Sequence, residues 1–261
     1  MSPMEASERH RVLDRARGLA VLIVRGLGQL LWPAACGICS TATGGPGNDL
    51  CSKCWSELLM CTAGDYCPGC GRDASPYGLI DGRCGACRSE VLSFDGIARV
   101  GVYGDALQRM ILAFKHDRSE LAATLAPLAD AALQGSRFRD EVDLFVPVPL
   151  HWTRRLRRGY NQSHLIARQL HAPHARISTD LVRARRTRMQ PQAATPAARA
   201  RNVAGAFVVR AGHDFAGKAV CLVDDVKTSG ATLNECAKAL KEAGAGRVYA
   251  LVLAVAGQRP A

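Results

Sequence analysis

The sequence has 261 residues, enough for one medium-sized domain and a small additional module. Apolar residues make up 48% and charged residues 22%, and this balance excludes a largely disordered chain. The formal net charge is +11, and only six of the 34 basic residues are lysine, so 28 are arginine. Arginine suits the bidentate recognition of phosphate or carboxylate groups.

The excess positive charge belongs to one part of the chain. Residues 1–90 carry nine basic and nine acidic side chains and are neutral. Residues 154–201 carry twelve arginines and a single acid, Asp180, which gives +11. Two interpretations stay open, a solvated arginine-rich surface and an anion-binding site.

The N-terminal segment, residues 1–32, contains an amphipathic pattern that predicts a helix over residues 10–31. Its longest apolar run, residues 19–24, is far shorter than the ~20 residues that a membrane-spanning helix needs. The flanks of this run offer no convincing small-residue cleavage site. We therefore expect neither a membrane span nor a signal peptide, and a cytoplasmic location.

Cysteine dominates the next segment, residues 33–92. Nine of the eleven cysteines lie between positions 36 and 87, and eight of them form four Cys-x-x-Cys pairs. Two such pairs complete a tetrahedral thiolate shell with no open position, which predicts two structural zinc ions. Iron–sulfur clusters or redox dithiols are the alternatives. In the sequential assignment, one ion is bound by Cys36, Cys39, Cys51 and Cys54 and the other by Cys67, Cys70, Cys84 and Cys87. A crossed arrangement of the same pairs is also open. Cys61 has no partner in this pattern and is expected not to bind metal.

The remaining chain, residues 95–257, has an α/β pattern. Short apolar strands alternate with helices, which predicts a parallel sheet covered by helices on both faces. In such a sheet, ligands bind at the carboxyl ends of the strands. The expected strands are 97–103, 143–149, 206–209, 219–223 and 248–255, and the expected helices are 105–115, 121–133, the second half of 151–170, and 229–244.

The strongest candidate site follows the strand over residues 219–223. Asp224 and Asp225 end this strand, and a hydroxyl- and glycine-containing loop, residues 227–230, leads into a helix with Thr232 in its first turn. Amide N–H groups at a helix N-terminus cradle phosphate, and paired carboxylates accept hydrogen bonds from vicinal ribose hydroxyls. The pattern predicts a site for a phosphorylated sugar. A plain surface turn is the alternative.

This segment resembles the phosphoribosyl diphosphate (PRPP) signature of type I phosphoribosyltransferases, with Ser229 where threonine is usual. Residues 28–256 as a whole resemble the ComF family of competence proteins, through the paired cysteine knuckles, VYGDALQRMILAFKHDR, VPVPLHWTRRLRRGYNQS and VDDVKTSGAT. The resemblance implies a double zinc ribbon followed by a phosphoribosyltransferase domain. It also implies a PRPP-binding set of Asp224, Asp225, Lys227, Thr228, Ser229, Gly230, Ala231 and Thr232.

Two arginine-rich segments receive roles from the same resemblance. The resemblance implies that the first segment forms a pyrophosphate loop after the strand over residues 143–149. It implies that the second segment forms a flexible loop that closes over PRPP. The spacing after the second segment, with Thr195 where relatives tend to carry leucine, departs from the family pattern. The residues are Val148, Pro149, Leu150, His151, Arg155, Arg157 and Arg158 for the first loop and Arg183, Arg185 and Arg186 for the second.

Two functions follow from these expectations. The first is an enzyme that binds PRPP with Mg²⁺ and transfers the phosphoribosyl group to an acceptor that the sequence does not identify, with a role in DNA uptake and natural competence that the resemblance implies. The second is a non-catalytic competence factor that binds single-stranded DNA or a protein of the competence machinery, with PRPP or another phosphoribosyl compound as a regulatory ligand. Trp152 and Tyr160 flank the first arginine segment and either stack on bases or anchor a loop.

Overall fold

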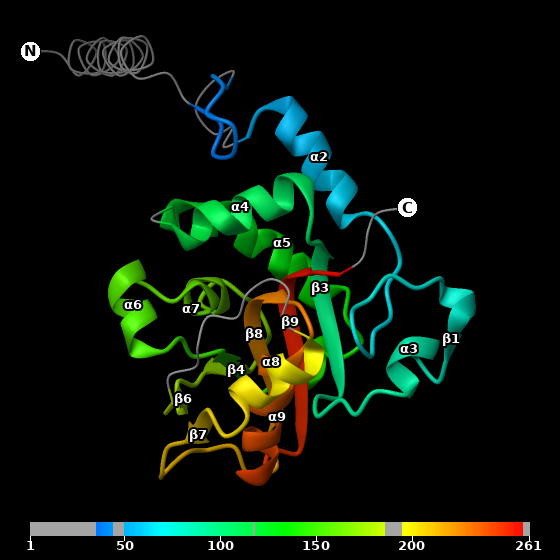
Figure 1. Ribbon diagram of the computed structural model, residues 1–261, viewed down its shortest axis with the longest axis vertical. Coiled ribbons are helices and arrows are strands. Elements are labelled where there is room, and N and C mark those ends of the chain that lie inside the picture. Colours follow the sequence, from blue (N-terminus) through cyan, green and yellow to red (C-terminus); the bar gives the residue numbers. More distant parts are fainter. Residues whose placement is uncertain (1–34, 44–49, 117, 186–194, 258–261) are drawn as a thin grey trace, which may run out of the picture. The chain divides into compact units, whose positions relative to one another are not determined.

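The structure is a computed structural model of the chain (Figure 1). It describes residues 35–43, 50–116, 118–185 and 195–257. The helix expected over residues 10–31 lies outside these ranges. The chain divides into two compact units, one that ends at Trp55 and one that begins at Ser56, and we describe each by itself.

A five-stranded sheet forms the centre of the unit that begins at Ser56 (Figure 1). Its order is β3-β9-β8-β4-β5, and every neighbouring pair is parallel, as the sequence predicts. Every residue of β3 and all but the first residue of β9 are buried, which explains why both strands are apolar almost throughout, with Arg99 as the charged exception in β3. The strands are β3 (Gly96–Val102), β4 (Leu144–Pro147), β5 (Arg176–Ile177), β8 (Ala219–Lys227) and β9 (Arg247–Val255).

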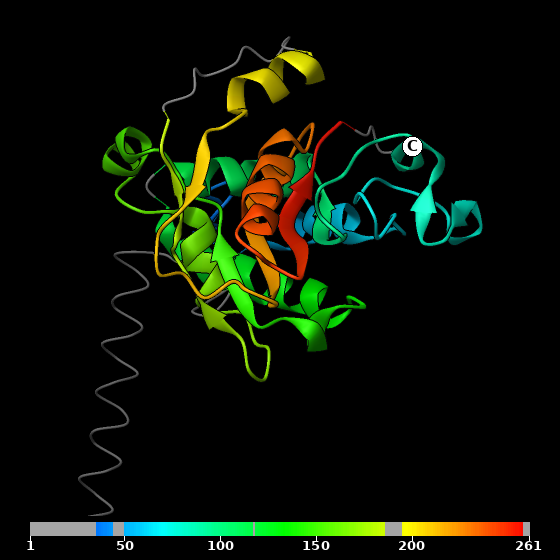
Figure 2. The ribbon, with the colours of Figure 1, turned by 90° about the horizontal axis from the view of Figure 1, so that it is seen from below.

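Helices cover both faces of this sheet (Figure 2). On one face, α5 (Ala122–Gln134) and α7 (Gln162–Ala167) contact each other and the strands. On the other face, α9 (Ala231–Glu242) packs its buried side chains against alternate residues of β8 and β9. The helix α4 (Asp105–Lys115) buries the residues spaced three and four apart along one side, as its amphipathic sequence predicts. Short 3₁₀ turns lie at Pro76–Gly78, Ser119–Leu121 and Arg139–Glu141.

The segment between α5 and β8 is broken into shorter pieces than the sequence pattern indicates. Residues 151–170 form two helices, α6 (Trp152–Arg158) and α7, because Gly159 has a φ of +75° and the Asn161 side chain caps α7. Further along the chain, Thr195 caps α8 (Pro196–Val203), whose first residue is proline. Neither α8 nor β5 is among the elements that the sequence predicts.

The strand expected over residues 206–209 forms, but outside the parallel sheet. It is β7 (Phe207–Val209), which pairs antiparallel with β6 (Leu181–Arg183) in a separate two-stranded sheet. Val208 is 44% exposed, so this strand is not buried on both faces as the parallel strands are. Its short apolar run alone does not distinguish the two environments.

The cysteine-rich region contains only short elements. These are α2 (Ser52–Thr62), β1 (Leu79–Ile80), β2 (Arg83–Cys84) and α3 (Gly85–Arg88), and β1 pairs antiparallel with β2. Within the described ranges, no helix combines the length and the apolar character needed to cross a bilayer.

Candidate functional site

The eight paired cysteines form two tetrads. In each tetrad the four sulfur atoms lie within 4.8 Å of one another. Closest approaches include 3.6 Å between the Cys39 and Cys51 sulfurs and 3.5 Å between those of Cys67 and Cys87. The structure brings together the sequential sets, Cys36, Cys39, Cys51 and Cys54 as the first tetrad and Cys67, Cys70, Cys84 and Cys87 as the second.

The donor set and its geometry fit structural zinc. Four sulfurs placed about 2.3 Å from one ion at tetrahedral corners lie roughly 3.8 Å apart, which matches these separations. In the second tetrad, burial raises the pKa of Cys67, but hydrogen bonds from backbone N–H groups, that of Cys84 first, outweigh this effect and lower the pKa to about 7. Burial raises the pKa of Cys87 to about 11 and that of Cys70 higher still, so Cys67 ionises to the thiolate that zinc binds more readily than these two neighbours. Cys61 stands apart from both tetrads, buried, with its thiol donating to the carbonyl of Gly104 at 3.4 Å.

The second tetrad is packed against the parallel sheet within one compact unit. Arg99 on β3 is 4% exposed, and its guanidinium donates to the carbonyl of Gly71 at 2.7 Å and pairs with Asp73. The same guanidinium lies 4.9 Å from the ring centre of Tyr66. The backbone N–H of Ile97 also donates to the carbonyl of Pro68 at 2.9 Å. The loop that carries Cys67 and Cys70 is therefore joined directly to β3.

The acid pair lies inside β8 and not after it. The strand expected to end at residue 223 continues to Lys227, because β9 pairs with it along that whole length. On its other side, pairing with β4 stops at Val223. Asp224 and Asp225 thus follow the point where β8 loses one neighbour, which leaves that side of the strand open to a ligand.

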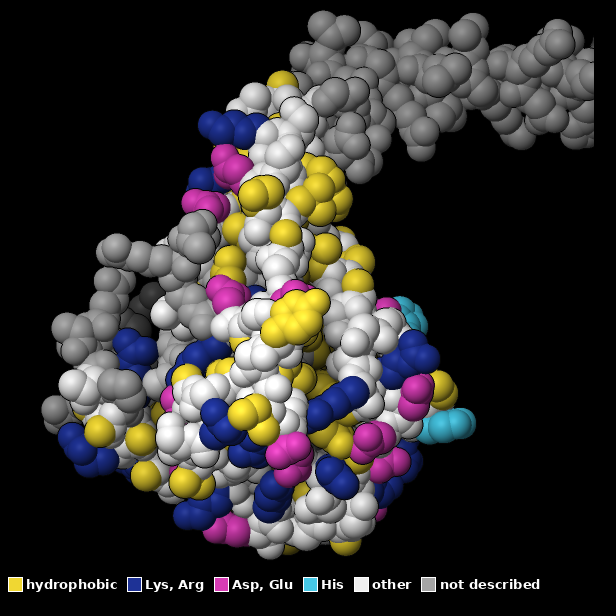
Figure 3. Space-filling model, turned by 90° about the vertical axis from the view of Figure 1, so that its right-hand side faces the viewer, with side chains coloured by type: hydrophobic (Ala, Val, Ile, Leu, Met, Phe, Trp, Pro, Cys, Tyr) yellow, Lys and Arg dark blue, Asp and Glu magenta, His cyan; other side chains and the backbone are white. Residues whose placement is uncertain are grey.

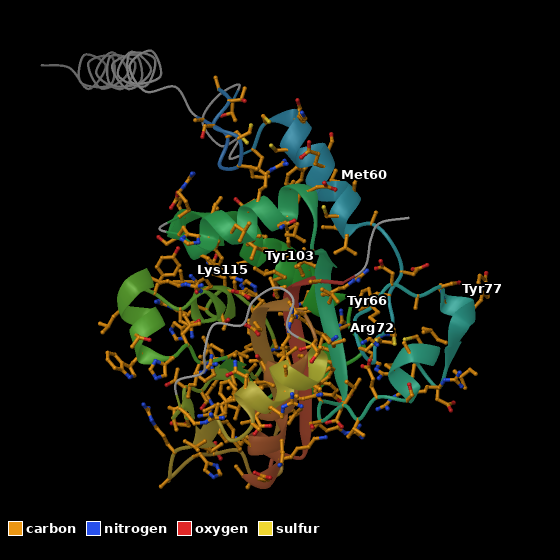
Figure 4. All side chains as sticks on the ribbon, viewed as in Figure 1. Met60, Tyr66, Arg72, Tyr77, Tyr103 and Lys115 are labelled. Atoms are coloured by element: carbon orange, nitrogen blue, oxygen red, sulfur yellow. The ribbon has the colours of Figure 1, made fainter. Side chains whose placement is uncertain are left out.

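Within the part of the chain that the structure describes, each acid of the pair is contacted by a side chain from a different helix. Lys115 is the last residue of α4 and is labelled in Figure 4. Its Nζ atom lies 3.0 Å from an Asp225 carboxylate oxygen. The Ser163 hydroxyl on α7 lies 3.5 Å from Asp224 Oδ1, which also accepts the backbone N–H of Asp225 at 2.9 Å. Sequence reasoning did not identify Lys115 or Ser163, although both lie in segments that carry the family resemblance.

The electrostatics of the pair differ between its two members. Burial first, and then the neighbouring charge of Asp225, raise the pKa of Asp224 to about 7. The Asp225 N–H, Lys115 and Ser163 oppose this shift in that order. Asp224 therefore changes charge near neutral pH, and perturbed carboxylates of this kind gather at functional sites.

The loop after the acid pair runs directly into α9. Gly230 has a φ of +79° and forms the N-cap of α9, and the Ser229 hydroxyl accepts the N–H of Ala231 at 3.5 Å. Thr228 is exposed, whereas Lys227 is only 2% exposed and its side chain lies against Gly230. Burial lowers the pKa of Lys227, and Arg72 lowers it further. Of the expected PRPP set, Lys227 is thus packed beneath the loop and Thr228 is presented at its surface.

The expected pyrophosphate loop follows β4 directly. Val148 is buried and donates its N–H to the carbonyl of Val223, and the buried His151 ring lies 2.9 Å from the Thr153 hydroxyl. Arg158 donates to the Gln162 side chain at 3.2 Å. The side chains of Arg155 and Arg157 lie outside the described residues.

Two of the three arginines of the expected flexible loop, Arg183 and Arg185, lie within the described residues. Arg183 belongs to strand β6, and its guanidinium lies 5.2 Å from the ring centre of Phe207. Arg185 donates to the carbonyls of Ala204 and Asn202, at 2.5 and 3.3 Å. Arg186 lies outside the described residues. These contacts hold Arg183 against β7 and Arg185 against the segment that precedes β7.

A cavity of about 510 Å³ lies between the expected pyrophosphate loop and strand β6. Apolar residues from both sides line it, together with Trp152, Arg183 and Arg210. No acidic side chain of the described residues lines it. The cavity is therefore suited to a ligand with an anionic group and a planar or apolar part.

Comparison with known proteins finds a match to each of two domain families. A model of the double zinc ribbon domain matches residues 27–91, and a model of the phosphoribosyl transferase domain matches residues 156–261. Competence protein F of Haemophilus influenzae is 31% identical over 79% of this chain and 90% of its own length. The chain belongs to the ComF family.

Other relatives agree with this assignment. The DNA utilization protein YhgH of Salmonella typhimurium is 31% identical over 84% of this chain and 96% of its own length. The competence protein ComFC of Bacillus subtilis is 28% identical over 76% and 80%. Among solved structures, a purine phosphoribosyltransferase from Pyrococcus horikoshii matches over 63% of this chain and 96% of its own length. The match has 14% identity and a TM-score of 0.21, which is too low to support a conclusion about fold or function.

Proposed function

We propose that this ComF protein binds PRPP at the loop after β8 and transfers its phosphoribosyl group to a nitrogen acceptor. The observation that carries the proposal is the half-buried pair Asp224 and Asp225, followed at once by a glycine-capped helix. The carboxylates would accept hydrogen bonds from the ribose hydroxyls. The N–H groups at the start of α9, with Thr228, Ser229 and Thr232, would donate to the 5′-phosphate.

The reaction replaces one bond at the ribose anomeric carbon with another. The C1′–O bond to the diphosphate breaks, pyrophosphate leaves, and a C1′–N bond to the acceptor forms. Arginines of residues 155–158 and 183–186 would hold the diphosphate, and Mg²⁺ would supply further neutralisation of its charge. Exclusion of water would protect the oxocarbenium-like transition state from hydrolysis.

Calorimetry with PRPP and MgCl₂ tests the binding step. We expect the double variant Asp224→Asn with Asp225→Asn to lose binding, because amides cannot replace two anionic acceptors. Asp214→Asn is the matched control, since Asp214 is an exposed acid paired with Lys218 elsewhere in the same unit. Unchanged affinity in the double variant would contradict the assignment.

The acceptor step needs a separate measurement. Release of pyrophosphate from PRPP, followed with a panel of nucleobases and amines, would identify an acceptor class and establish turnover. Tight PRPP binding without release in any combination would favour a regulatory role for the ligand.

A second candidate function is binding of single-stranded DNA in the cytoplasm during natural transformation. It is supported by α6, whose seven residues include four arginines, with Trp152 64% and Leu156 75% exposed, beside the cavity described above. The relatives named for competence and for DNA utilization support it as well. By contrast, the face shown in Figure 3 carries interspersed basic and acidic side chains, and such mixed charge does not indicate a nucleic-acid-binding surface.

A salt titration of binding to a labelled oligo(dT) tests this second function. We expect affinity to fall steeply with salt, with a slope of about −0.7 for each phosphate neutralised. Trp152→Ala should weaken binding, because stacking on an aromatic ring contributes about 1–3 kcal/mol per base. Weak, salt-independent binding would contradict a role in binding single-stranded DNA. A protein of the competence machinery would then be the partner to test.

A further inference from the structure

The acid pair is held by a structure that neither the PRPP signature nor the arginine segments explain. Lys115 reaches Asp225 from α4, and Ser163 reaches Asp224 from α7. The two partners lie 48 positions apart in the chain and belong to different helices. Something must therefore fix these two helices relative to each other.

The carbonyl group of Phe114, near the end of α4, is hydrogen-bonded to side chains at the start of α7 and just before it. The carbonyl oxygen of Phe114, next to Lys115, accepts the Tyr160 hydroxyl at 2.6 Å and the Gln162 side-chain amide at 3.3 Å. Gln162 is 1% exposed and immediately precedes Ser163. The Phe114 side chain is fully buried, and its ring centre lies 5.9 Å from that of Tyr160. Because Phe114 and Gln162 are buried and Tyr160 is half-buried, these hydrogen bonds are costly to break and hold the end of α4 against the start of α7.

We infer that Lys115 and Ser163, joined through the Phe114 carbonyl, form a clamp that positions the Asp224–Asp225 pair for its ligand. This inference rests on the proposed binding of PRPP at that pair. It assigns Tyr160 and Gln162 of the RRGYNQ segment a role as anchors of the clamp. Lys115 and Ser163 are thereby positioning residues, which act through the carboxylates and not on the ligand.

Charge supports the same role for Lys115. The groups that act on Asp224 are Asp225 on the same strand, Lys115 from α4 and the Ser163 hydroxyl from α7, and Asp224 in turn raises the pKa of Cys236 on α9. Among these, Lys115 is the cation, so it offsets the repulsion between the two carboxylates. Without it, Asp225 loses its partner and Asp224 ionises only at a higher pH.

The test compares Lys115→Met, Lys115→Arg and the control Lys218→Met by PRPP–Mg²⁺ calorimetry between pH 5.5 and 8.5. Lys218 pairs with Asp214 at 2.9 Å, so its loss removes a similar ion pair away from the acids. We expect Lys115→Met to weaken binding at pH 7 by about tenfold and to move the pH midpoint of binding upward. Lys115→Arg should restore much of the affinity, and Lys218→Met should match the wild type.

A double-variant cycle separates positioning from direct contact. If Lys115 acts through Asp225, then Lys115→Met together with Asp225→Asn should bind no more weakly than Asp225→Asn alone. Additive losses would mean that Lys115 contacts the ligand itself, and unchanged affinity in Lys115→Met would mean that it has no role. Either result overturns the clamp. Lys115→Gln, with a thermal melting curve, replaces Lys115→Met if that variant does not fold.

Titration of the free protein distinguishes failure of the clamp from failure of the proposed function. Carboxyl ¹³C NMR of the unliganded protein reports the ionisation of Asp224 in wild type, Lys115→Met and Tyr160→Phe. An upward shift of the midpoint in Lys115→Met, with a smaller one in Tyr160→Phe, supports the clamp even if the wild type binds no PRPP. An unshifted midpoint in Lys115→Met overturns it.

Discussion

The two cysteine tetrads have the same ligands and the same spacing within each pair, but different surroundings. In the first, Cys39 is exposed and Cys51 half-buried. In the second, all four cysteines are at most 9% exposed, and the loop that carries Cys67 and Cys70 is hydrogen-bonded to strand β3. The first lies in the unit that ends at Trp55, and the second lies in the same unit as the parallel sheet. Identical metal chemistry therefore has different consequences for the rest of the protein.

The largest effect is expected when a ligand of the second tetrad is removed. Cys84→Ser should lower the melting temperature of the sheet-containing unit sharply, because a structural zinc site contributes roughly 10 kcal/mol or more to the fold it organises. Cys51→Ser, the matching ligand of the first tetrad, should leave that melting transition nearly unchanged. Circular dichroism and the zinc content of each variant measure both outcomes. Equal losses from the two variants would remove the distinction between the tetrads.

A smaller loss is expected from Arg99→Met, which retains the apolar stem but removes the guanidinium. The change leaves the Gly71 carbonyl without its donor and Asp73 without its cation, at a cost of about 2–4 kcal/mol in the free energy of unfolding. Arg109→Met is the control, because Arg109 makes an exposed pair with Glu57. Urea denaturation followed by tryptophan fluorescence measures both. A loss no larger than the control's would show that the Arg99 contacts contribute little.

A moderate effect is expected at Gly71, beside the second tetrad. Its φ is +78°, and a Cβ atom there would lie 3.1 Å from the Val255 side chain at the end of β9. Gly71→Ala should cost about 1–2 kcal/mol from the left-handed backbone alone. Gly78→Ala should be close to neutral, since no atom lies within 4 Å of its added methyl group. Thermal melting compares the two, and similar curves would contradict close packing of this loop on the sheet.

The smallest effect on the sheet-containing unit should come from removing the metal of the first tetrad. Hydrogen bonds from the Thr41 side chain and backbone lower the pKa of Cys39 to about 6, and its exposure leaves it open to chelators and thiol reagents. Under mild chelation we expect one zinc ion to leave with no change in the melting of the sheet-containing unit. The second ion should leave only with unfolding. Simultaneous release of both ions would contradict the predicted difference in how firmly the two tetrads hold zinc.

Short-range patterns predicted much of this structure. The Cys-x-x-Cys pairs, the continuous apolar strands and the amphipathic α4 each depend on residues that are close in sequence, and each forms where the pattern indicates. The segment between α5 and β8 was less accessible, because its short strands and helices depend on caps and pairings that apolar spacing does not reveal. Thus β7 was placed in the wrong sheet, and α8 was not predicted.

The same limit applies to the candidate site. Asp224, Asp225 and the glycine-capped start of α9 are contiguous, so the sequence alone is enough to predict this part of the candidate site. Lys115 and Ser163 reach the acids from other segments, and no local pattern links a lysine at the end of one helix to an aspartate 110 positions later.

What the sequence determined by itself is the kind of chemistry this protein carries: two thiolate tetrads and one acid-and-glycine loop, each encoded in neighbouring residues. What only the tertiary structure decided is how these parts depend on one another. The buried Arg99 joins the second tetrad to the sheet, and the Phe114 carbonyl joins the partners of the acid pair. These links depend on packing between distant segments, where burial makes each unpaired polar group costly and so selects one arrangement.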